Sequence, residues 1–194
     1  MMNIETPNLP DAEILYFPDF FSETEADLYS ERILKDTAWR QDKIKIFGKE
    51  MLQPRLTALF AENTKSYTYS GLTMHPEAFP EVLLEIKQAV EKVSEVRFTA
   101  CLLNLYRNGR DSMGWHADDE KELGRNPEIA SVSFGAERIF HLKHKKKNAR
   151  FKLKLENGSL LIMKGSTQHF WKHQLPKTKM EIGHRINLTF RKID

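Results

Sequence analysis

Cysteine is nearly absent from this chain of 194 residues, in which Cys101 stands alone. A single cysteine cannot form an intramolecular disulfide, and it excludes zinc sites built from several cysteines. Long apolar runs are also missing: residues 160–163 form one of the longest, whereas a membrane-spanning helix needs about 20 such residues. The first residues, MMNIETP, contain neither a basic nor an apolar segment. We therefore expect no signal peptide and no membrane association.

The composition is that of an ordinary globular protein, with 40% hydrophobic and 29% charged residues. This excludes wholesale disorder and fibrous repeats, and the length predicts a single domain over residues 1–194. The net charge of +3 hides an uneven distribution. Residues 1–36 hold nine acids and two bases, whereas residues 141–154 hold seven Lys or Arg and no acid. This asymmetry favours a polyanionic partner, and the alternative is a solvated face of one or two strands.

Two helices and a hairpin are predicted in the first half of the chain. The sequence SETE at residues 22–25 is a capping box and predicts a helix that ends near Asp36. Apolar residues at helical spacing predict a second helix over about residues 80–94. Residues 43–48 alternate polar and apolar and end in glycine, which predicts a hairpin with Phe47 at its tip.

Short strands dominate the chain after residue 96. Seven candidate strands lie at residues 98–106, 129–135, 138–143, 150–155, 159–164, 169–174 and 185–191. Such spacing predicts a double-stranded β-helix, or jelly roll, as the core over about residues 97–194. Residues 1–96, including an extended arm at 7–21, are expected to pack outside this core. The predicted fold class is therefore α+β.

A candidate metal site is centred on the sequence WHAD at residues 115–118. In an extended segment His116 and Asp118 point the same way, and a distant histidine would complete the 2-His-1-carboxylate set that binds non-heme Fe(II). The competing interpretation is a surface turn in an acidic run. Spacing leaves the second histidine open among His141, His144, His169, His173 and His184.

The last predicted strand indicates an anion site. Its polar residues share one face, and its apolar residues share the other. The polar set is Arg185, Asn187, Thr189 and Arg191. Arginines inside a small barrel would need an anion, and a guanidinium suits a carboxylate. Asn104 and Tyr106 end another strand and could face the same anion. The alternative is that the polar face of residues 185–191 is the wet side of an edge strand.

Four motifs, taken in order, resemble the AlkB family of Fe(II)/2-oxoglutarate-dependent dioxygenases. They are NLY at 104–106, HAD at 116–118, WKH at 171–173 and RINLTFR at 185–191. The chain most resembles the homologue-2 type of DNA dealkylase in that family, and the resemblance covers about residues 40–193. It implies a jelly-roll core, a bound Fe(II), 2-oxoglutarate as cosubstrate and dioxygen as oxidant.

The resemblance also assigns roles to the pocket residues. His116, Asp118 and His173 would hold the iron, since the family pattern Trp-x-His-x-Leu-Pro selects His173 over His169. Arg191 would pair with the distal carboxylate of 2-oxoglutarate, helped by Tyr106. The remaining polar atoms of the cosubstrate would meet Asn104, Arg185, Asn187 and Thr189.

The implied reaction is oxidative demethylation of N-alkylated bases, of the 1-methyladenine or 3-methylcytosine type, in duplex or single-stranded DNA. Its products would include formaldehyde, succinate and carbon dioxide. The alternatives are the same chemistry on RNA or a non-nucleic-acid substrate, and a binding module without a metal. We expect the protein to be a monomer. Its expected location is the cytoplasm (nucleoid) of a prokaryote or the nucleus of a eukaryote, because its substrate would be DNA.

A base inside a duplex must be flipped out before it can react. By resemblance, Phe47, Gly48 and Lys49 would intercalate in its place. Tyr67, Thr68 and Tyr69 would cover the flipped base, with Tyr69 opposite His116. Asp119 would offset the positive charge of a methylated base, and the basic residues 143–147 would contact phosphates. The alternative for Phe47 and the two tyrosines is ordinary strand packing.

Overall fold

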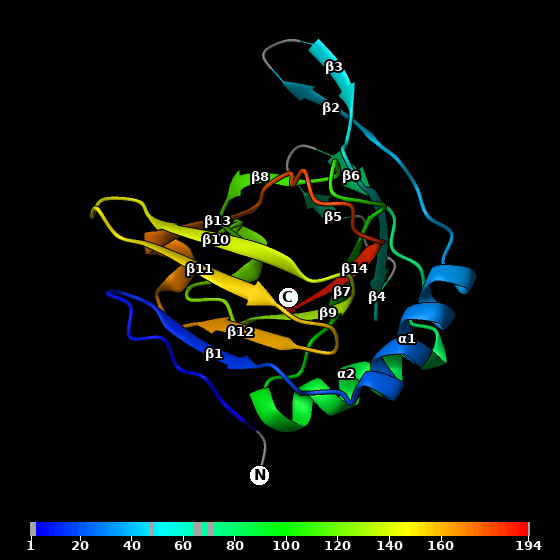
Figure 1. Cartoon of the computed structure of the whole chain (residues 1–194), viewed down its shortest axis with the longest axis horizontal. Coiled ribbons are helices and arrows are strands. Elements are labelled where there is room, and N and C mark those ends of the chain that lie inside the picture. Colours follow the sequence, from blue (N-terminus) through cyan, green and yellow to red (C-terminus); the bar gives the residue numbers. More distant parts are fainter. Residues whose placement is uncertain (1–2, 47–48, 64–66, 70–71, 194) are drawn as a thin grey trace.

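The computed structural model describes residues 3–46, 49–63, 67–69 and 72–193, and of residues 45, 46, 49, 67–69 and 72–74 the backbone alone. Two antiparallel β-sheets face each other, and two helices cover the outer side of the larger sheet (Figure 1). This double-sheet arrangement confirms the predicted jelly roll. No helix among the described residues has the length and apolarity needed to cross a bilayer.

The larger sheet has six strands in the order β1-β12-β9-β14-β7-β4. Their bounds are β1 (Glu13–Phe17), β4 (Leu56–Ala61), β7 (Ala100–Tyr106), β9 (Ile129–Gly135), β12 (Leu160–Lys164) and β14 (Arg185–Arg191). The last strand, β14, pairs with β9 on one side and β7 on the other, and all seven of its residues are buried. The flanking strands pair both edges of β14, while the helices on one side and the smaller sheet on the other enclose its two faces.

The smaller sheet has the order β11-β10-β13-β8. Its strands are β8 (Met113–His116), β10 (Arg138–His144), β11 (Arg150–Leu155) and β13 (Trp171–Leu175). An apolar cluster that includes Tyr16, Leu142 and Trp171 fills part of the space between the two sheets. The polar face of β14 lines another part of that space, where a pocket remains.

The expectation that residues 1–96 pack outside the core is wrong for two segments. The predicted extended arm contains β1, which pairs with β12 at the edge of the larger sheet. At the opposite edge, β4 pairs with β7. Ile14 and Tyr16 of β1 point into the cluster between the sheets. Both ends of the sequence therefore build the sheet, because its edge strands come from the N-terminal part.

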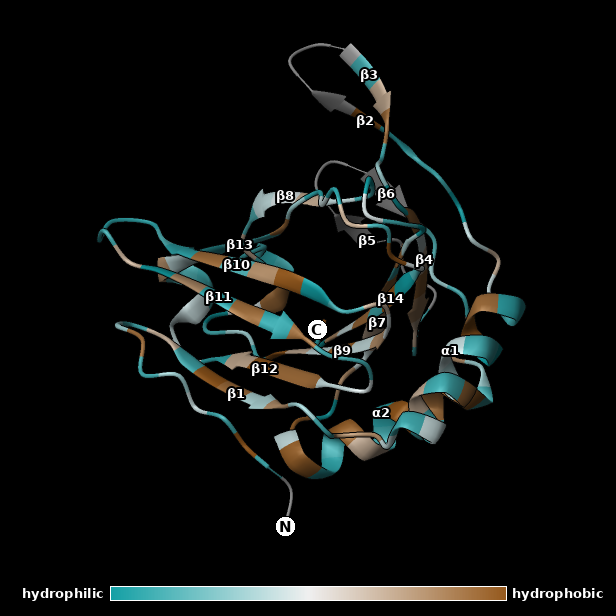
Figure 2. Ribbon diagram, in the orientation of Figure 1, coloured by the Kyte–Doolittle hydropathy of each residue, from teal (hydrophilic) through white to brown (hydrophobic). Residues whose placement is uncertain are grey.

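The two predicted helices are confirmed as α1 (Glu23–Asp36) and α2 (Glu81–Ser94). At the start of α1, Ser22 and Glu25 form the predicted capping box through both reciprocal hydrogen bonds. Pro80 is the residue before α2 rather than part of its first turn. The apolar stripes of both helices pack against the outer face of the larger sheet (Figure 2). That face of β14 carries Ile186, Leu188 and Phe190.

Two small hairpins extend the same end of the molecule (Figure 1). One pairs β2 (Lys43–Ile46) with β3 (Lys49–Leu52), and the other pairs β5 (Tyr67–Tyr69) with β6 (Leu72–Met74). The first hairpin confirms the prediction for residues 43–48 in its strands. Its expected tip, Phe47 and Gly48, lies outside the described residues.

Residues 169–174 are not one strand, as the sequence predicts. A helical turn, α3 (Thr167–Phe170), precedes β13. A separate 3-10 turn lies at Lys121–Leu123, after β8. The hydroxyl of Thr167 donates to the Lys164 carbonyl at 2.6 Å and accepts the Glu13 amide at 2.9 Å. The local bond to Lys164 and the bond to the distant Glu13 together favour the turn over an extended backbone.

Candidate metal centre and anion pocket

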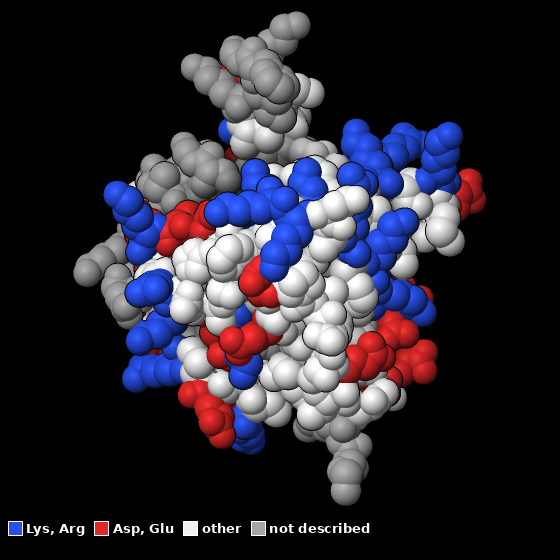
Figure 3. Space-filling model, turned by 90° about the vertical axis from the view of Figure 1, so that its left-hand side faces the viewer, with Lys and Arg blue, Asp and Glu red and all other residues white. Residues whose placement is uncertain are grey.

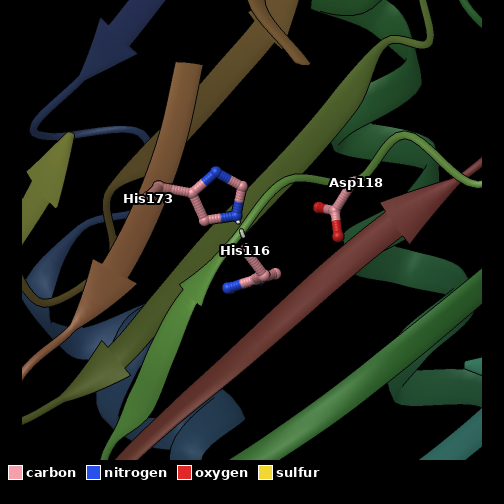
Figure 4. A group of neighbouring side chains, drawn as sticks. All are labelled: His116, Asp118 and His173. Atoms are coloured by element: carbon pink, nitrogen blue, oxygen red, sulfur yellow. Dashed lines mark hydrogen bonds between the residues drawn. The ribbon is translucent and has the colours of Figure 1, made fainter. Parts of the chain in front are cut away.

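The structure brings together three of the residues singled out from the sequence. His116 ends β8, Asp118 follows two residues later, and His173 lies in the middle of β13. His116 and His173 are cross-strand partners in the smaller sheet. One ligand atom from each of the three side chains lies within 4.8 Å of the other two. Figure 4 shows the two rings beside each other, with the Asp118 carboxylate facing them.

Hydrogen bonding fixes how His116 presents its ring. Its Nδ1 lies 2.9 Å from the Gly114 carbonyl oxygen, which can only accept, so Nδ1 carries the proton and Nε2 keeps its lone pair. That Nε2 lies 3.1 Å from Nε2 of His173. Two imidazole nitrogens that bind one metal ion at about 2.1 Å and at right angles are about 3.0 Å apart. The observed spacing therefore suits a shared ion.

The protonation states also suit metal binding. Burial lowers the pKa of His173 to about 3, and burial likewise lowers the pKa of His116. Both rings are therefore neutral near pH 7, as metal ligands must be. Burial alone would raise the pKa of Asp118, but Arg191 and the two imidazoles hold it at about 2. Two neutral imidazoles and one carboxylate are the donor set that suits non-heme Fe(II).

The other four candidates for the second histidine ligand lie elsewhere and are engaged by other groups. His144 contacts Asp11, His184 contacts Ser30, His141 contacts Gln174, and His169 contacts the backbone of Asn126. Among the described residues, no second cluster of three potential ligands is present. The choice that spacing left open is therefore decided by the pairing of β13 with β8.

All six residues that the sequence links to the cosubstrate line the same pocket as the metal cluster. They are Asn104, Tyr106, Arg185, Asn187, Thr189 and Arg191. Arg185 and Arg191 are each only 3% exposed. The polar face of β14 is therefore turned inward, and its interpretation as a wet outer face is wrong.

The buried environment of Arg185 favours a bound anion. Its Nη2 donates to Ser133 Oγ at 2.9 Å, and its guanidinium lies 5.4 Å from the centre of the Tyr106 ring. Its Nε is buried without a hydrogen-bond partner among the described residues. Burial lowers the pKa of Arg185 to about 10, so the side chain stays charged at pH 7. A small carboxylate would satisfy both the charge and the open donor.

The two arginines occupy opposite ends of the pocket. Arg185 is the cross-strand partner of Tyr106, whereas Arg191 donates to Asp118 at 3.0 Å. Six residues of strand place their Cα atoms about 20 Å apart. Arg191 and Tyr106, which were expected to contact the same distal carboxylate, thus lie apart: Tyr106 is beside Arg185, and Arg191 is beside the metal cluster.

The three smaller polar residues are bonded within the protein. Asn104 Oδ1 accepts from Arg55 Nε at 2.8 Å. Asn187 donates to Ser131 Oγ and to the Val132 carbonyl, while its Oδ1 accepts from the Thr189 hydroxyl. Asn104, Asn187 and Thr189 line the pocket and also hold its walls together.

The sequence analysis missed three residues near the pocket. Arg55 escaped because β4 was not predicted, so the residue before that strand had no assigned face. Ser131 lines the pocket, and Ser133 holds Arg185. The alternation of both serines with Ala130 and Val132 in a predicted strand was a usable signal, because it puts the serines on one face.

The predicted substrate residues are described only in part. Phe47 and Gly48 lie outside the described residues, and the side chains of Lys49, Tyr67, Thr68 and Tyr69 are not described. Asp119 is half exposed beside the metal cluster, and its carboxylate accepts from Lys145 Nζ at 2.9 Å. The Lys145 ammonium group therefore points toward Asp119 and the carbonyl oxygen of Gln168.

The sequence was compared with known proteins, and the matches agree with a site for iron and 2-oxoglutarate. Residues 13–191 match the 2OG-Fe(II) oxygenase superfamily. The chain is 42% identical to bovine (Bos taurus) "Alpha-ketoglutarate-dependent dioxygenase alkB homolog 3" over 186 residues, which are 91% of this chain and 64% of that protein. It is 38% identical to human (Homo sapiens) "DNA oxidative demethylase ALKBH2" over 184 residues, which are 89% of this chain and 70% of that protein. The chain thus spans less than two thirds of the bovine relative.

A solved structure agrees with the fold. "The structure of OsALKBH1" superposes with a TM-score of 0.68 over 97% of this chain and 100% of that chain. At 19% identity this likeness concerns the fold alone. Together with the metal cluster and the buried Arg185, the matches show that the chain belongs to the AlkB family of the 2OG-Fe(II) oxygenase superfamily, whose cofactors are Fe(II), 2-oxoglutarate and dioxygen.

Proposed function

We propose that this chain is an Fe(II)/2-oxoglutarate-dependent demethylase of N-alkylated bases, of the 1-methyladenine or 3-methylcytosine type, in DNA. The observation that carries the proposal is that His116, Asp118 and His173 line the same pocket as the buried Arg185. Iron held by these three side chains would supply, together with 2-oxoglutarate and dioxygen, the oxidising chemistry that converts an N-linked methyl group to formaldehyde. One relative is named a DNA oxidative demethylase, which supports DNA as the substrate.

In this proposal one end of the pocket binds the cosubstrate, and the other end binds the iron. Arg185 binds the distal carboxylate of 2-oxoglutarate, since its Nε is an open buried donor and Tyr106 lies beside it. His116, Asp118 and His173 hold the iron. Arg191 keeps the Asp118 carboxylate ionised and fixes its orientation. The apolar wall formed by residues such as Phe140 and Leu155 limits access of water.

The basic run is the proposed contact for DNA phosphates. Lys and Arg side chains gather on the upper part of the face shown in Figure 3. Lys146, Arg150 and Lys152 are exposed at the β10–β11 end of the smaller sheet. The Nζ of Lys143 lies 4.3 Å from the centre of the ring of Trp115, the residue before His116 in β8. Phosphate contacts of this kind provide affinity without sequence preference.

Contacts to the flipped base remain proposals of the same kind. Phe47, Gly48 and Lys49 would fill the gap in the duplex, and Tyr67, Thr68 and Tyr69 would cover the base. Asp119 lies next to Asp118 in the chain and would face a positively charged methylated base. A protein with this activity would work in the nucleoid or the nucleus, as a monomer.

The proposal is tested by measuring formaldehyde released from a methylated DNA oligonucleotide, single-stranded and duplex, with Fe(II), 2-oxoglutarate and ascorbate. His116→Ala and Asp118→Ala should abolish release. His141→Ala is the matched control, because His141 lies in the same sheet but outside the pocket, and it should leave release unchanged. Faster turnover of the RNA of the same sequence would favour the RNA alternative, and no release from any oligonucleotide would contradict a nucleic-acid substrate.

A further inference from the structure

Gln168 connects the helical turn α3 to the metal cluster. Its side chain is only 1% exposed, although glutamine is usually a surface residue. Its Oε1 accepts the backbone N–H of Asp118 at 3.0 Å, and its Nε2 lies 3.6 Å from the sulfur of Met163. A buried amide in this position makes a specific bond to the backbone of a residue in the metal cluster.

Asp118 needs such a bond because the sheet does not hold it. Strand β8 ends at His116, so the backbone two residues further on has no ladder hydrogen bonds of that strand. The Asp118 carboxylate is held by Arg191 at 3.0 Å, and its N–H is held by Gln168 at 3.0 Å. The two bonds act on different parts of the residue, one on the carboxylate and one on the backbone.

The position of Gln168 is itself fixed by two neighbours. Lys145 Nζ donates to the Gln168 carbonyl oxygen at 2.9 Å and to Asp119 Oδ2 at 2.9 Å. Thr167, also 1% exposed, ties the start of the turn to β12 and β1 through its hydroxyl. The lysine therefore joins α3 to the loop that carries Asp118, while the threonine anchors the turn to the larger sheet.

We propose that Gln168 is a positioning residue for the metal centre, which holds the backbone of Asp118 so that its carboxylate faces His116 and His173. This inference rests on the proposed function, in which these three side chains bind Fe(II). Groups that orient metal ligands typically change metal affinity 10- to 100-fold when they are removed. Gln168 is not among the residues that line the pocket, and its effect would be transmitted through Asp118.

The test measures the affinity for Mn(II), a redox-silent substitute for Fe(II), in the absence of substrate and dioxygen. Gln168→Met keeps the side-chain length and removes the amide oxygen. Thr167→Val is the matched control, since it weakens the anchor of the same turn and leaves the amide of Gln168 in place. The melting temperature of each metal-free variant is recorded beside its affinity. If Gln168→Met does not fold, Gln168→Asn, which shortens the reach by one methylene, replaces it.

We expect Gln168→Met to bind Mn(II) at least about tenfold more weakly than the wild-type chain. Thr167→Val should lower the melting temperature and change the affinity by less than about threefold. An unchanged affinity in Gln168→Met, or an equal loss in both variants, would overturn the inference while the metal centre stands. A wild-type chain that binds no Mn(II) would overturn the proposed function and the inference with it.

Discussion

The guanidinium of Arg191 donates a 3.0 Å hydrogen bond to the carboxylate of Asp118, and both residues are at most 3% exposed. The carboxylate therefore stays ionised inside the protein, with its pKa held at about 2. The pairing places Arg191 at the metal end of the pocket, whereas Arg185 is the arginine proposed to bind the cosubstrate.

Removing the positive charge from the pair should destabilise the metal-free protein strongly. Arg191→Met leaves the Asp118 carboxylate buried without its partner charge, and breaking a buried pair in this way costs about 3–5 kcal/mol. The free energy of unfolding in urea measures the effect. The double variant Arg191→Met/Asp118→Asn should recover part of the loss, because no buried charge is then left uncompensated. Equal stability of the single variant and the wild type would contradict the pairing.

Removing the charge at the other end of the pocket should affect the cosubstrate alone. Arg185→Met should weaken binding of 2-oxoglutarate to the Mn(II)-loaded protein at least about thirtyfold, since a truncated charge pair typically loses 2 kcal/mol or more. The Mn(II) affinity should change little, because Arg185 lies at the far end of β14 from Asp118. Calorimetry with each ligand separates the two effects. Loss of Mn(II) binding with 2-oxoglutarate binding retained would reverse the assignment.

Acid should destabilise the metal-free protein through His173. Burial lowers the pKa of His173 from an ordinary 6.5 to about 3, so between these values the unfolded chain takes up a proton that the folded protein does not. Stability contributed by this group is complete above pH 6.5 and falls as the pH drops toward 3. Urea titrations at pH 7, 6 and 5 measure the slope. His173→Gln should flatten it, and an equally steep slope in that variant would show that other groups cause the acid sensitivity.

Binding of DNA should depend on the exposed lysines of the basic run. Lys146→Ala should weaken binding to all sequences alike and lower the slope of log Kd against log salt concentration by about one. Lys92→Ala is the matched control, since Lys92 is an exposed lysine on α2, which covers the outer side of the larger sheet. Fluorescence anisotropy at several salt concentrations measures both. Equal slopes for Lys146→Ala and the wild type would place the phosphates elsewhere.

Local patterns in the sequence determined where helices and strands form and which side chains share one face of an element. The capping box at Ser22 fixed the start of α1, because both of its hydrogen bonds join residues three apart. Strict alternation over residues 185–191 fixed that Arg185 and Arg191 share a face of one strand. The order of short motifs also indicated the family, since the motifs need no knowledge of the fold.

The tertiary structure alone decided which of these residues meet. Spacing left the second histidine open and only the resemblance selected His173, whereas the pairing of β13 with β8 gives the physical reason. The turn at α3 is stabilised by the bond of Thr167 to Glu13, which is far away in the sequence. The inward direction of the β14 polar face is set by the layers around the sheet, because the helices cover its apolar face and the pocket between the sheets lies at its polar face. A strand pattern states which side chains lie together on a face. It does not state what faces them, because that depends on packing between segments that are distant along the chain.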